Sequence, residues 1–132
     1  MNTGLLFVYG TLRIGARSPM TRFLSQNSQL VGRASAWGKL YRVAHYPGLV
    51  PSRDPKDTVI GDVFRLKDAA TVLKRLDIHE GCGPASPKPT EYVRMIVPVR
   101  LDDGAELSAW TYLYNWPVKA LDRIKSGDFL KR

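Results

Sequence analysis

An uninterrupted apolar run, Leu5 to Tyr9, constrains the fold most strongly because it offers no polar side to face water. Such a run is typical of a strand that is buried on both faces. It stops at Gly10, where the predicted strand gives way to a loop. The N-terminal part of the chain is therefore expected to supply a buried strand followed by a loop.

Most other apolar segments also predict strands. Their extents are Leu30–Val43, as one or two strands bent at Gly32 and Gly38, then Thr58–Leu66, Tyr92–Leu101 and Leu107–Tyr114. Asp102-Asp103-Gly104 indicates a hairpin turn between the last two, and Tyr46-Pro47-Gly48 has the composition of another turn. Antiparallel strands dominate and helices are few, so the predicted class is α+β, with a strongly curved sheet or a small barrel.

Two helices are predicted beside these strands. Ser18 followed by Pro19 is typical of an N-cap and a first helical position, and a short helix is expected to run through Leu24. The second helix is expected to begin after Asp68. Its core-facing stripe follows helical spacing and consists of Ala69, Val72, Leu73 and Leu76. Gly81 can end this helix, because glycine tolerates the left-handed backbone conformation.

Glu80 continues the apolar stripe of the second helix, where a carboxylate is unexpected. Burial and the negative end of the helix dipole both disfavour its charged form, so its pKa is expected to rise toward neutrality. A carboxyl group tuned in this way suits proton transfer near neutral pH. The alternative is that the helix frays after Leu76 and leaves Glu80 solvated.

The loop after the first strand has the sequence Tyr9-Gly10-Thr11-Leu12-Arg13. Where a strand breaks into a loop at glycine, backbone N–H groups lose their sheet partners and can bind an anion or a developing oxyanion. The loop is not a Walker motif, because no Gly-Lys-Ser/Thr follows. It is not a dinucleotide-binding fingerprint either, because the three-glycine spacing is missing.

Length and composition indicate a single folded domain and argue against a disulfide, a metal site and a membrane span. The 132 residues suit a single domain over 1–132, and 44% hydrophobic residues argue against disorder. The single cysteine, Cys82, excludes an internal disulfide, and with only two histidines no metal site is expected. The apolar run Leu5 to Tyr9 is too short for a signal peptide or a membrane span, so a cytoplasmic protein without a membrane partner is expected.

The formal net charge of +8 is compatible with nucleic-acid binding. However, the basic residues are spread from Arg13 to Arg132, with adjacent pairs only at Lys74-Arg75 and Lys131-Arg132. No basic run interleaved with aromatic residues is present. A solvated basic surface without a nucleic-acid partner is the favoured interpretation, and its charge can still steer small anionic substrates.

The segment Leu6–Arg13 resembles the opening strand and loop of the gamma-glutamylcyclotransferase-like, or AIG2-like, family. The resemblance continues in order along nearly the whole chain, through Tyr46–Val50, Val59–Phe64, Leu76–Gly81, Tyr92–Arg94, Ala109–Tyr112 and Arg123–Phe129. The opening motif and the Glu80-Gly81 pair together are quite specific. Cys82 departs from the family pattern, since many relatives carry an aromatic residue there.

This resemblance implies a small, mixed and mostly antiparallel β-barrel with a few short helices. It implies a cavity lined by the loop at 9–12, a catalytic glutamate at Glu80, and release of 5-oxoproline from a gamma-glutamyl substrate without a cofactor. The expected mechanism is attack by the substrate's own α-amine, with Glu80 as general base and then general acid. The substrate-binding candidates are Tyr9, Gly10, Thr11, Leu12, Tyr46 and Tyr112. The tyrosines among them could instead pack the core or the barrel.

Several alternatives stay open at this point. The chain could be a non-catalytic small-molecule-binding or interaction module on the same fold. His79, Glu80 and Cys82 could form a cysteine-hydrolase site, although a small buried thiol is commoner. Arg94 could bind the substrate carboxylate or lie on the surface. The leaving amine is left open, and a monomer or weak homodimer is expected.

Overall fold

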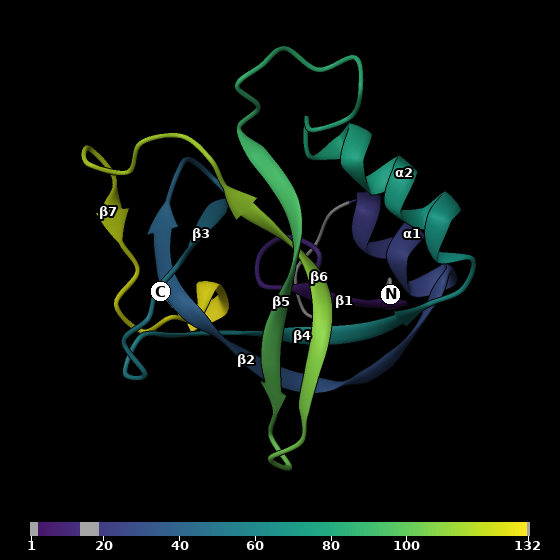
Figure 1. Ribbon diagram of the computed structural model, residues 1–132, viewed down its shortest axis with the longest axis horizontal. Helices are drawn as coiled ribbons and strands as arrows, with labels where there is room; N and C mark the ends of the chain where they lie inside the picture. Colours follow the sequence, from purple (N-terminus) through teal and green to yellow (C-terminus); the bar gives the residue numbers. More distant parts are fainter. Residues whose placement is uncertain (1–2, 14–18, 132) are drawn as a thin grey trace.

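Five strands of the described chain close into a small barrel (Figure 1). The computed structural model describes residues 3–13 and 19–131. The barrel strands are β1 Leu5–Val8, β2 Ser28–Arg42, β3 Pro47–Pro51, β4 Thr58–Leu66 and β6 Glu106–Tyr114. They pair in the order β1–β4–β2–β3–β6, and β6 returns to β1. The β3–β6 and β6–β1 pairs are parallel and the others antiparallel, which confirms the mixed, mostly antiparallel barrel.

Strand β5 (Tyr92–Leu101) lies outside this ring and forms a hairpin with β6. Its last residues also pair with β2, from Val99 to Leu101. Pro98 precedes that second pairing and faces Ser108 of β6, in agreement with the edge position that proline favours. The short strand β7 (Asp122–Arg123) pairs with the far end of β2.

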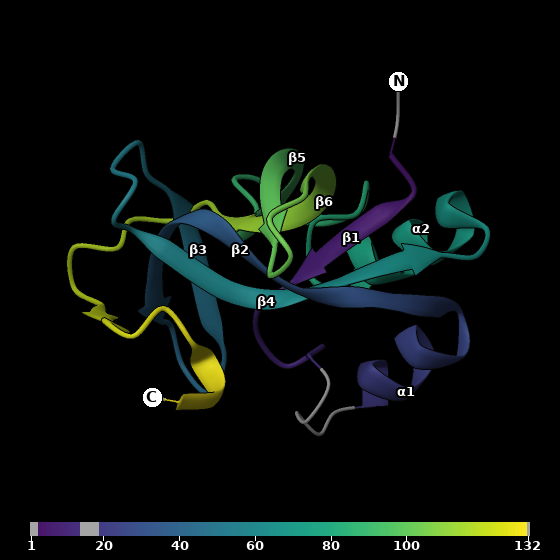
Figure 2. The same cartoon turned by 90° about the horizontal axis from the view of Figure 1, so that it is seen from below.

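Helix α1 (Pro19–Gln26) and helix α2 (Ala69–His79) lie at the same end of the barrel, opposite the C-terminal segment with its short 3-10 helix η1 (Phe129–Lys131), as Figure 1 and Figure 2 show. The few short helices expected are therefore present. The predicted cap at Ser18 lies outside the described residues. Asp68 does precede α2, but with a left-handed φ of 48° and without a side-chain capping bond. Its carboxylate accepts a hydrogen bond from the hydroxyl of Thr71 instead.

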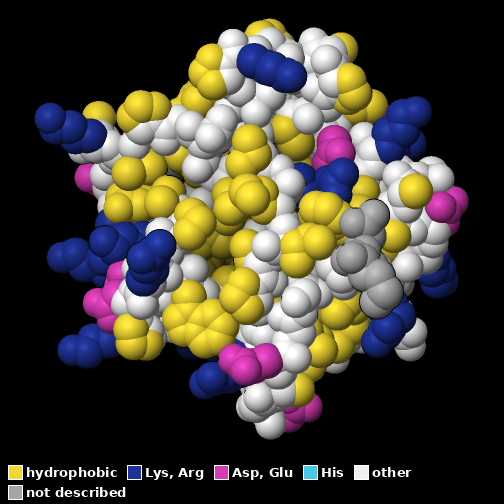
Figure 3. All heavy atoms as spheres, in the orientation of Figure 1, with side chains coloured by type: hydrophobic (Ala, Val, Ile, Leu, Met, Phe, Trp, Pro, Cys, Tyr) yellow, Lys and Arg dark blue, Asp and Glu magenta, His cyan; other side chains and the backbone are white. Residues whose placement is uncertain are grey.

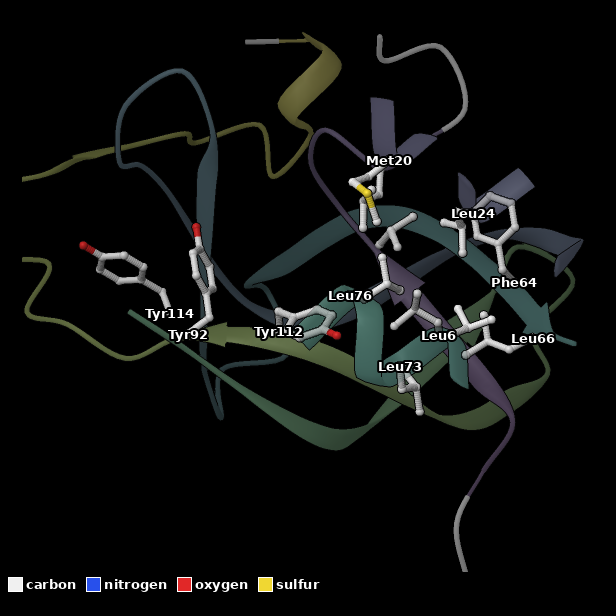
Figure 4. Close-up of a cluster of buried hydrophobic side chains, with 13 residues drawn as sticks. Leu6, Met20, Leu24, Phe64, Leu66, Leu73, Leu76, Tyr92, Tyr112 and Tyr114 are labelled. Atoms are coloured by element: carbon white, nitrogen blue, oxygen red, sulfur yellow. The ribbon is translucent and has the colours of Figure 1, made fainter. Parts of the chain in front are cut away.

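Two clusters of buried side chains explain why the first strand is apolar throughout. Leu6 and Val8 join a cluster that packs both helices against β1, β4 and β6, whereas Phe7 and Tyr9 join a second cluster with residues from all the barrel strands. In Figure 4 the first cluster has a mainly aliphatic part around the helices and β1, which also includes Phe64, and a part made of tyrosines, Tyr92, Tyr112 and Tyr114. Exposure of at most 4% from Leu6 to Val8 confirms burial of β1 on both faces.

The turn predicted at Tyr46–Gly48 is wrong in position. Pro47 and Gly48 begin strand β3, and the turn lies just before it, where the N–H of Val43 donates to the C=O of Tyr46 (3.1 Å). A Cβ at Gly48 would lie 2.7 Å from side-chain atoms of Tyr114. This glycine therefore serves a close approach between strands rather than a turn.

The long segment from residue 28 to residue 42 is one strand rather than two. It bulges between Leu30 and Gly32 and continues without a break. A bulge increases local twist, which helps a small sheet to close on itself. Strand β2 consequently pairs with β3, β4, β5 and β7 along its length.

Hydrophobic side chains gather over the middle of the face seen in Figure 3, while Lys and Arg side chains project mainly near its margins. This distribution agrees with a solvated basic surface. Among the residues that the structure describes, no helix has the length and apolar character that crossing a bilayer requires.

Candidate active site

A cavity of about 520 Å³ lies between the end of β1, the end of α2 and residues of β3, β5 and β6. All the residues predicted for the site border it: Tyr9, Gly10, Thr11, Leu12, Tyr46, Glu80 and Tyr112. Glu91, which no motif marks, borders it as well. The fold therefore brings the loop after the first strand and the end of the second helix to one cavity, although they are far apart in sequence.

Glu80 is the C-cap residue of α2. Its N–H donates to the C=O of Leu76 (2.8 Å), so the helix continues past Leu76 instead of fraying there. Gly81 follows with a φ of 72°, and the N–H of Cys82 donates back to the C=O of Asp77 (2.9 Å). These features form a Schellman motif, which confirms the helix end predicted at Gly81.

The carboxyl group of Glu80 is partly buried at the border of the cavity. Burial, and secondly the charge of Glu91, raise the pKa of Glu80 to about 7. The negative end of the α2 dipole disfavours the carboxylate in the same direction. A carboxyl group with this pKa is present in both protonation states near neutral pH, so it can accept a proton and return it.

Asp77 fastens the end of α2 to the sheet. Its carboxylate accepts a bidentate pair of hydrogen bonds from Arg94 of β5, from Nε at 2.7 Å and from Nη2 at 3.0 Å. The hydroxyl of Tyr112 on β6 also donates to it, at 2.7 Å. The guanidinium of Arg94 lies over the ring of Trp110, 4.3 Å from its centroid. Glu80 follows Asp77 by about one helical turn, so this network also fixes the position of Glu80.

The network gives Arg94 and Tyr112 roles that the sequence did not indicate. The guanidinium of Arg94 is occupied by Asp77, so it stabilises the helix end rather than presenting a charge to the cavity. Tyr112 borders the cavity, yet its hydroxyl is held by the same carboxylate. No sequence signal distinguished Asp77 from other polar positions of α2.

Replacing Asp77 with asparagine should lower the free energy of unfolding by about 1–3 kcal/mol, because the partly buried guanidinium of Arg94 loses its carboxylate. The pKa of Glu80 should fall from about 7 toward its ordinary value as the helix end loosens. Chemical denaturation measures the first effect and NMR titration of the carboxyl groups the second. Glu106→Gln is the control, since it breaks an exposed pair with Arg100 (3.4 Å) and should cost under about 1 kcal/mol. Equal stability of the two variants would contradict the proposed role of Asp77.

Arg13 anchors the loop that follows β1 through buried ion pairs. Its guanidinium contacts Asp128 (2.7 Å) and Asp62 (3.4 Å), and none of the three side chains is more than 11% exposed. The N–H of Arg13 donates to the C=O of Gly10 (3.1 Å), which closes a turn across 10–13. The C-terminal segment and strand β4 thus hold the loop that borders the cavity.

Gly10 and Tyr9 allow the start of this loop to pack closely against β3. A Cβ at Gly10 would lie 2.9 Å from ring carbons of Pro47, so a larger residue would push the loop away. The hydroxyl of Tyr9 donates to the C=O of Tyr112 and accepts the N–H of Leu49 (3.2 Å). Burial raises the pKa of Tyr9, so this hydroxyl keeps its proton. Tyr9 therefore ties the end of β1 to β3 and β6 besides bordering the cavity.

A second carboxylate of the cavity belongs to Glu91. The hydroxyl of Tyr46 donates to its Oε2 at 2.6 Å. Burial and this hydrogen bond raise the pKa of Tyr46 to about 12, so the hydroxyl remains a donor at neutral pH. Glu91 follows a proline-rich loop and has no periodic pattern around it, which is why the sequence alone did not mark it.

The surroundings of Cys82 disfavour the cysteine-hydrolase alternative. Its Sγ lies 4.0 Å from a carboxylate oxygen of Asp77. Burial, then the charges of Asp77 and Glu80, raise the pKa of this thiol to about 11, whereas a nucleophilic cysteine needs a thiolate. His79 borders the cavity, and burial lowers its pKa. Within the described ranges, no three His, Cys, Asp or Glu side chains gather in a way that could hold a metal ion.

Comparison with known proteins matches this chain to a family. The family model described as "Gamma-glutamyl cyclotransferase, AIG2-like" matches residues 6–131. The gamma-glutamylcyclotransferase family protein YtfP of Escherichia coli (strain K12) is 36% identical over 128 residues, which are 96% of each chain. The solution NMR structure of ytfP from Escherichia coli has a TM-score of 0.66 at 35% identity and covers 97% of both chains.

A crystal structure of an AIG2-like protein from Mus musculus shares the fold. Its TM-score is 0.71 at 21% identity, over 95% of this chain and 88% of that one. The family match includes both the loop after β1 and Glu80. The chain therefore belongs to the gamma-glutamyl cyclotransferase, AIG2-like family.

Proposed function

We propose that this chain is a cyclotransferase that releases 5-oxoproline from a gamma-glutamyl amine or a gamma-glutamyl peptide. The observation that carries the proposal is a carboxyl group, Glu80, whose pKa of about 7 suits proton transfer at the border of a cavity of about 520 Å³. Membership of the family supports the same reaction class.

In the first half of the reaction, Glu80 removes a proton from the α-ammonium of the substrate. The freed amine attacks the γ-carbonyl carbon and closes a five-membered ring, which is favoured because both groups belong to one molecule. The carbonyl oxygen becomes an oxyanion, for which the backbone N–H groups of Gly10, Thr11 and Leu12 are candidate donors. The same loop can also bind the α-carboxylate of the substrate.

In the second half, protonated Glu80 donates its proton to the leaving nitrogen. The bond between that nitrogen and the γ-carbon breaks, and the ring nitrogen gives up its extra proton to Glu80, which passes it to water. The products are 5-oxoproline and a free amine. One carboxyl group thus acts in turn as base and acid, and the atoms balance without a cofactor.

Incubating the purified protein with a panel of gamma-glutamyl amino acids and gamma-glutamyl alkylamines tests the proposal. Each turnover should give one 5-oxoproline and one free amine, both quantified by liquid chromatography with mass spectrometry. If panel members bind but none yields 5-oxoproline, the chain is a non-catalytic small-molecule-binding module on the same fold.

The pH dependence of kcat/KM should follow the ionisation of Glu80. Because only the carboxylate can accept the proton, kcat/KM should rise with pH and level off above about pH 7. Initial rates measured in a constant-ionic-strength buffer series would give this profile. A profile that stays flat through neutral pH would show that another group is the base.

A further inference from the structure

The charges that border the cavity are acidic, although the whole chain is basic. The formal net charge is +8, yet Glu80 and Glu91 carry the only formal charges among the described residues that border the cavity, which also include two histidines. The nearby guanidinium groups of Arg13 and Arg94 are paired with aspartates. The cavity is therefore suited to a positive charge on its ligand.

Glu91 is anchored independently of Glu80. The hydroxyl of Tyr46 donates to its Oε2 at 2.6 Å, and its backbone C=O accepts the N–H of Asn115 at 2.7 Å. A carboxylate accepts hydrogen bonds on both oxygens. Glu91 can therefore receive a hydrogen bond from a ligand while Tyr46 keeps the side chain in place.

We propose that Glu91 is a substrate-binding residue that holds the α-ammonium group of the gamma-glutamyl substrate. The inference rests on the proposed function, which supplies this cationic group in every substrate and brings it to Glu80. The α-carboxylate and the γ-carbonyl oxygen of the substrate are acceptors and need donors, such as the N–H groups of the loop at 10–12. The ammonium needs an acceptor, and a charge-assisted hydrogen bond to Glu91 provides it.

The two carboxylates then act on the same nitrogen atom: Glu91 binds it and Glu80 accepts its proton. The α-ammonium donates one N–H to Glu91 and one to Glu80, and the proton of the second bond moves to Glu80. The nitrogen lone pair forms the bond to the γ-carbonyl carbon, and the electron pair of the C=O bond moves to oxygen. The nitrogen gains positive charge as this bond forms, and the carboxylate of Glu91 stabilises that charge in place.

Binding of two matched ligands tests the inference directly. One ligand is the n-butylamide of the glutamyl γ-carboxyl group, and the other is its counterpart without the α-amino group, 5-(butylamino)-5-oxopentanoate. In a Glu80→Gln protein, which prevents turnover during calorimetric titration, the amino ligand should bind about tenfold more tightly. Adding Glu91→Gln should reduce this ratio to about one, since the ammonium loses its acceptor.

Two further variants sharpen the comparison. Tyr46→Phe releases Glu91 from its anchor and should lower the ratio in the same direction by a smaller factor. Glu106→Gln changes the net charge by the same amount on an exposed side chain and should leave the ratio unchanged. In an otherwise wild-type protein, Glu91→Gln should raise KM about tenfold. It should also move the acid limb of the pH profile to lower pH, because Glu80 loses a neighbouring negative charge.

The outcomes distinguish this inference from the proposed function. If wild-type protein releases 5-oxoproline but Glu91→Gln leaves the ligand ratio unchanged, Glu91 does not hold the ammonium, and only the inference is overturned. If the protein releases no 5-oxoproline, yet Glu91→Gln abolishes the preference for the amino ligand, the ammonium site stands and the cyclotransferase proposal fails.

Discussion

Replacing Glu80 with glutamine should lower the rate of 5-oxoproline release by about 10²–10⁴-fold, the usual contribution of a general acid–base group. Glutamine keeps the size and polarity of the side chain but can neither take up nor return a proton. The proximity of the two reacting groups does not depend on the carboxyl group, because both belong to the substrate, so a residual rate should remain. Quantifying 5-oxoproline at substrate saturation measures the effect.

The same substitution should make the protein more stable above neutral pH. The pKa of Glu80 is raised from its ordinary value of 4.5 to about 7, so the folded state binds this proton more tightly than the unfolded chain does. Its contribution to stability is therefore complete at low pH and is lost as the pH rises through about 7. Glutamine avoids this loss, so at pH 8 the variant should gain up to about 3 kcal/mol in free energy of unfolding.

Lower activity together with higher stability is a combination that damage to the fold does not produce. Circular dichroism and urea denaturation at about pH 5 and pH 8 serve as the controls, and the gain should shrink at the lower pH. Full activity of Glu80→Gln would show that Glu80 is not the general acid–base group of the reaction. Reduced stability at pH 8 would show that its carboxylate is stabilised in the fold.

Replacing Arg13 with methionine should lower the free energy of unfolding by about 3–5 kcal/mol, the effect of removing one partner from a buried ion pair. Asp62 and Asp128 would remain buried without their shared cation. Urea denaturation at neutral pH measures the loss. Arg33→Met is the matched control, because its pair with Asp102 spans 3.9 Å between side chains that are 50% and 66% exposed, and should contribute under about 1 kcal/mol.

The loop that borders the cavity should lose protection in the Arg13→Met protein before the barrel does. Native-state hydrogen exchange of the amides at 10–13 reports this local opening. If Arg13→Met and Arg33→Met cost the same stability, the buried pairs do not anchor the loop.

Patterns among neighbouring residues correctly predicted the buried strand β1 and the end of helix α2. The apolar run of β1 is buried on both faces because two separate clusters cover it, and the helical spacing of α2 continues to a glycine with positive φ at Gly81. The sequence pattern that indicated each of these features spans only a few neighbouring residues. The expected position of Glu80 at the helix end followed from the same spacing.

Features that depend on distant partners were not predicted. Asp77, Glu91 and Asp128 act through Arg94, Tyr46 and Arg13, and nothing in their own surroundings in the sequence indicates those contacts. The composition of Tyr46–Gly48 indicated a turn, but packing against Tyr114 places its last two residues in a strand. Tertiary contacts overrode a local preference at this point.

The bond between Arg13 and Asp128 joins residues separated by 115 positions. During synthesis, the loop that borders the cavity emerges long before the residue that holds it in place. Formation of this contact requires Asp128 itself to have left the ribosome. The cavity therefore cannot reach the shape described here until Asp128 has been synthesised and has met Arg13.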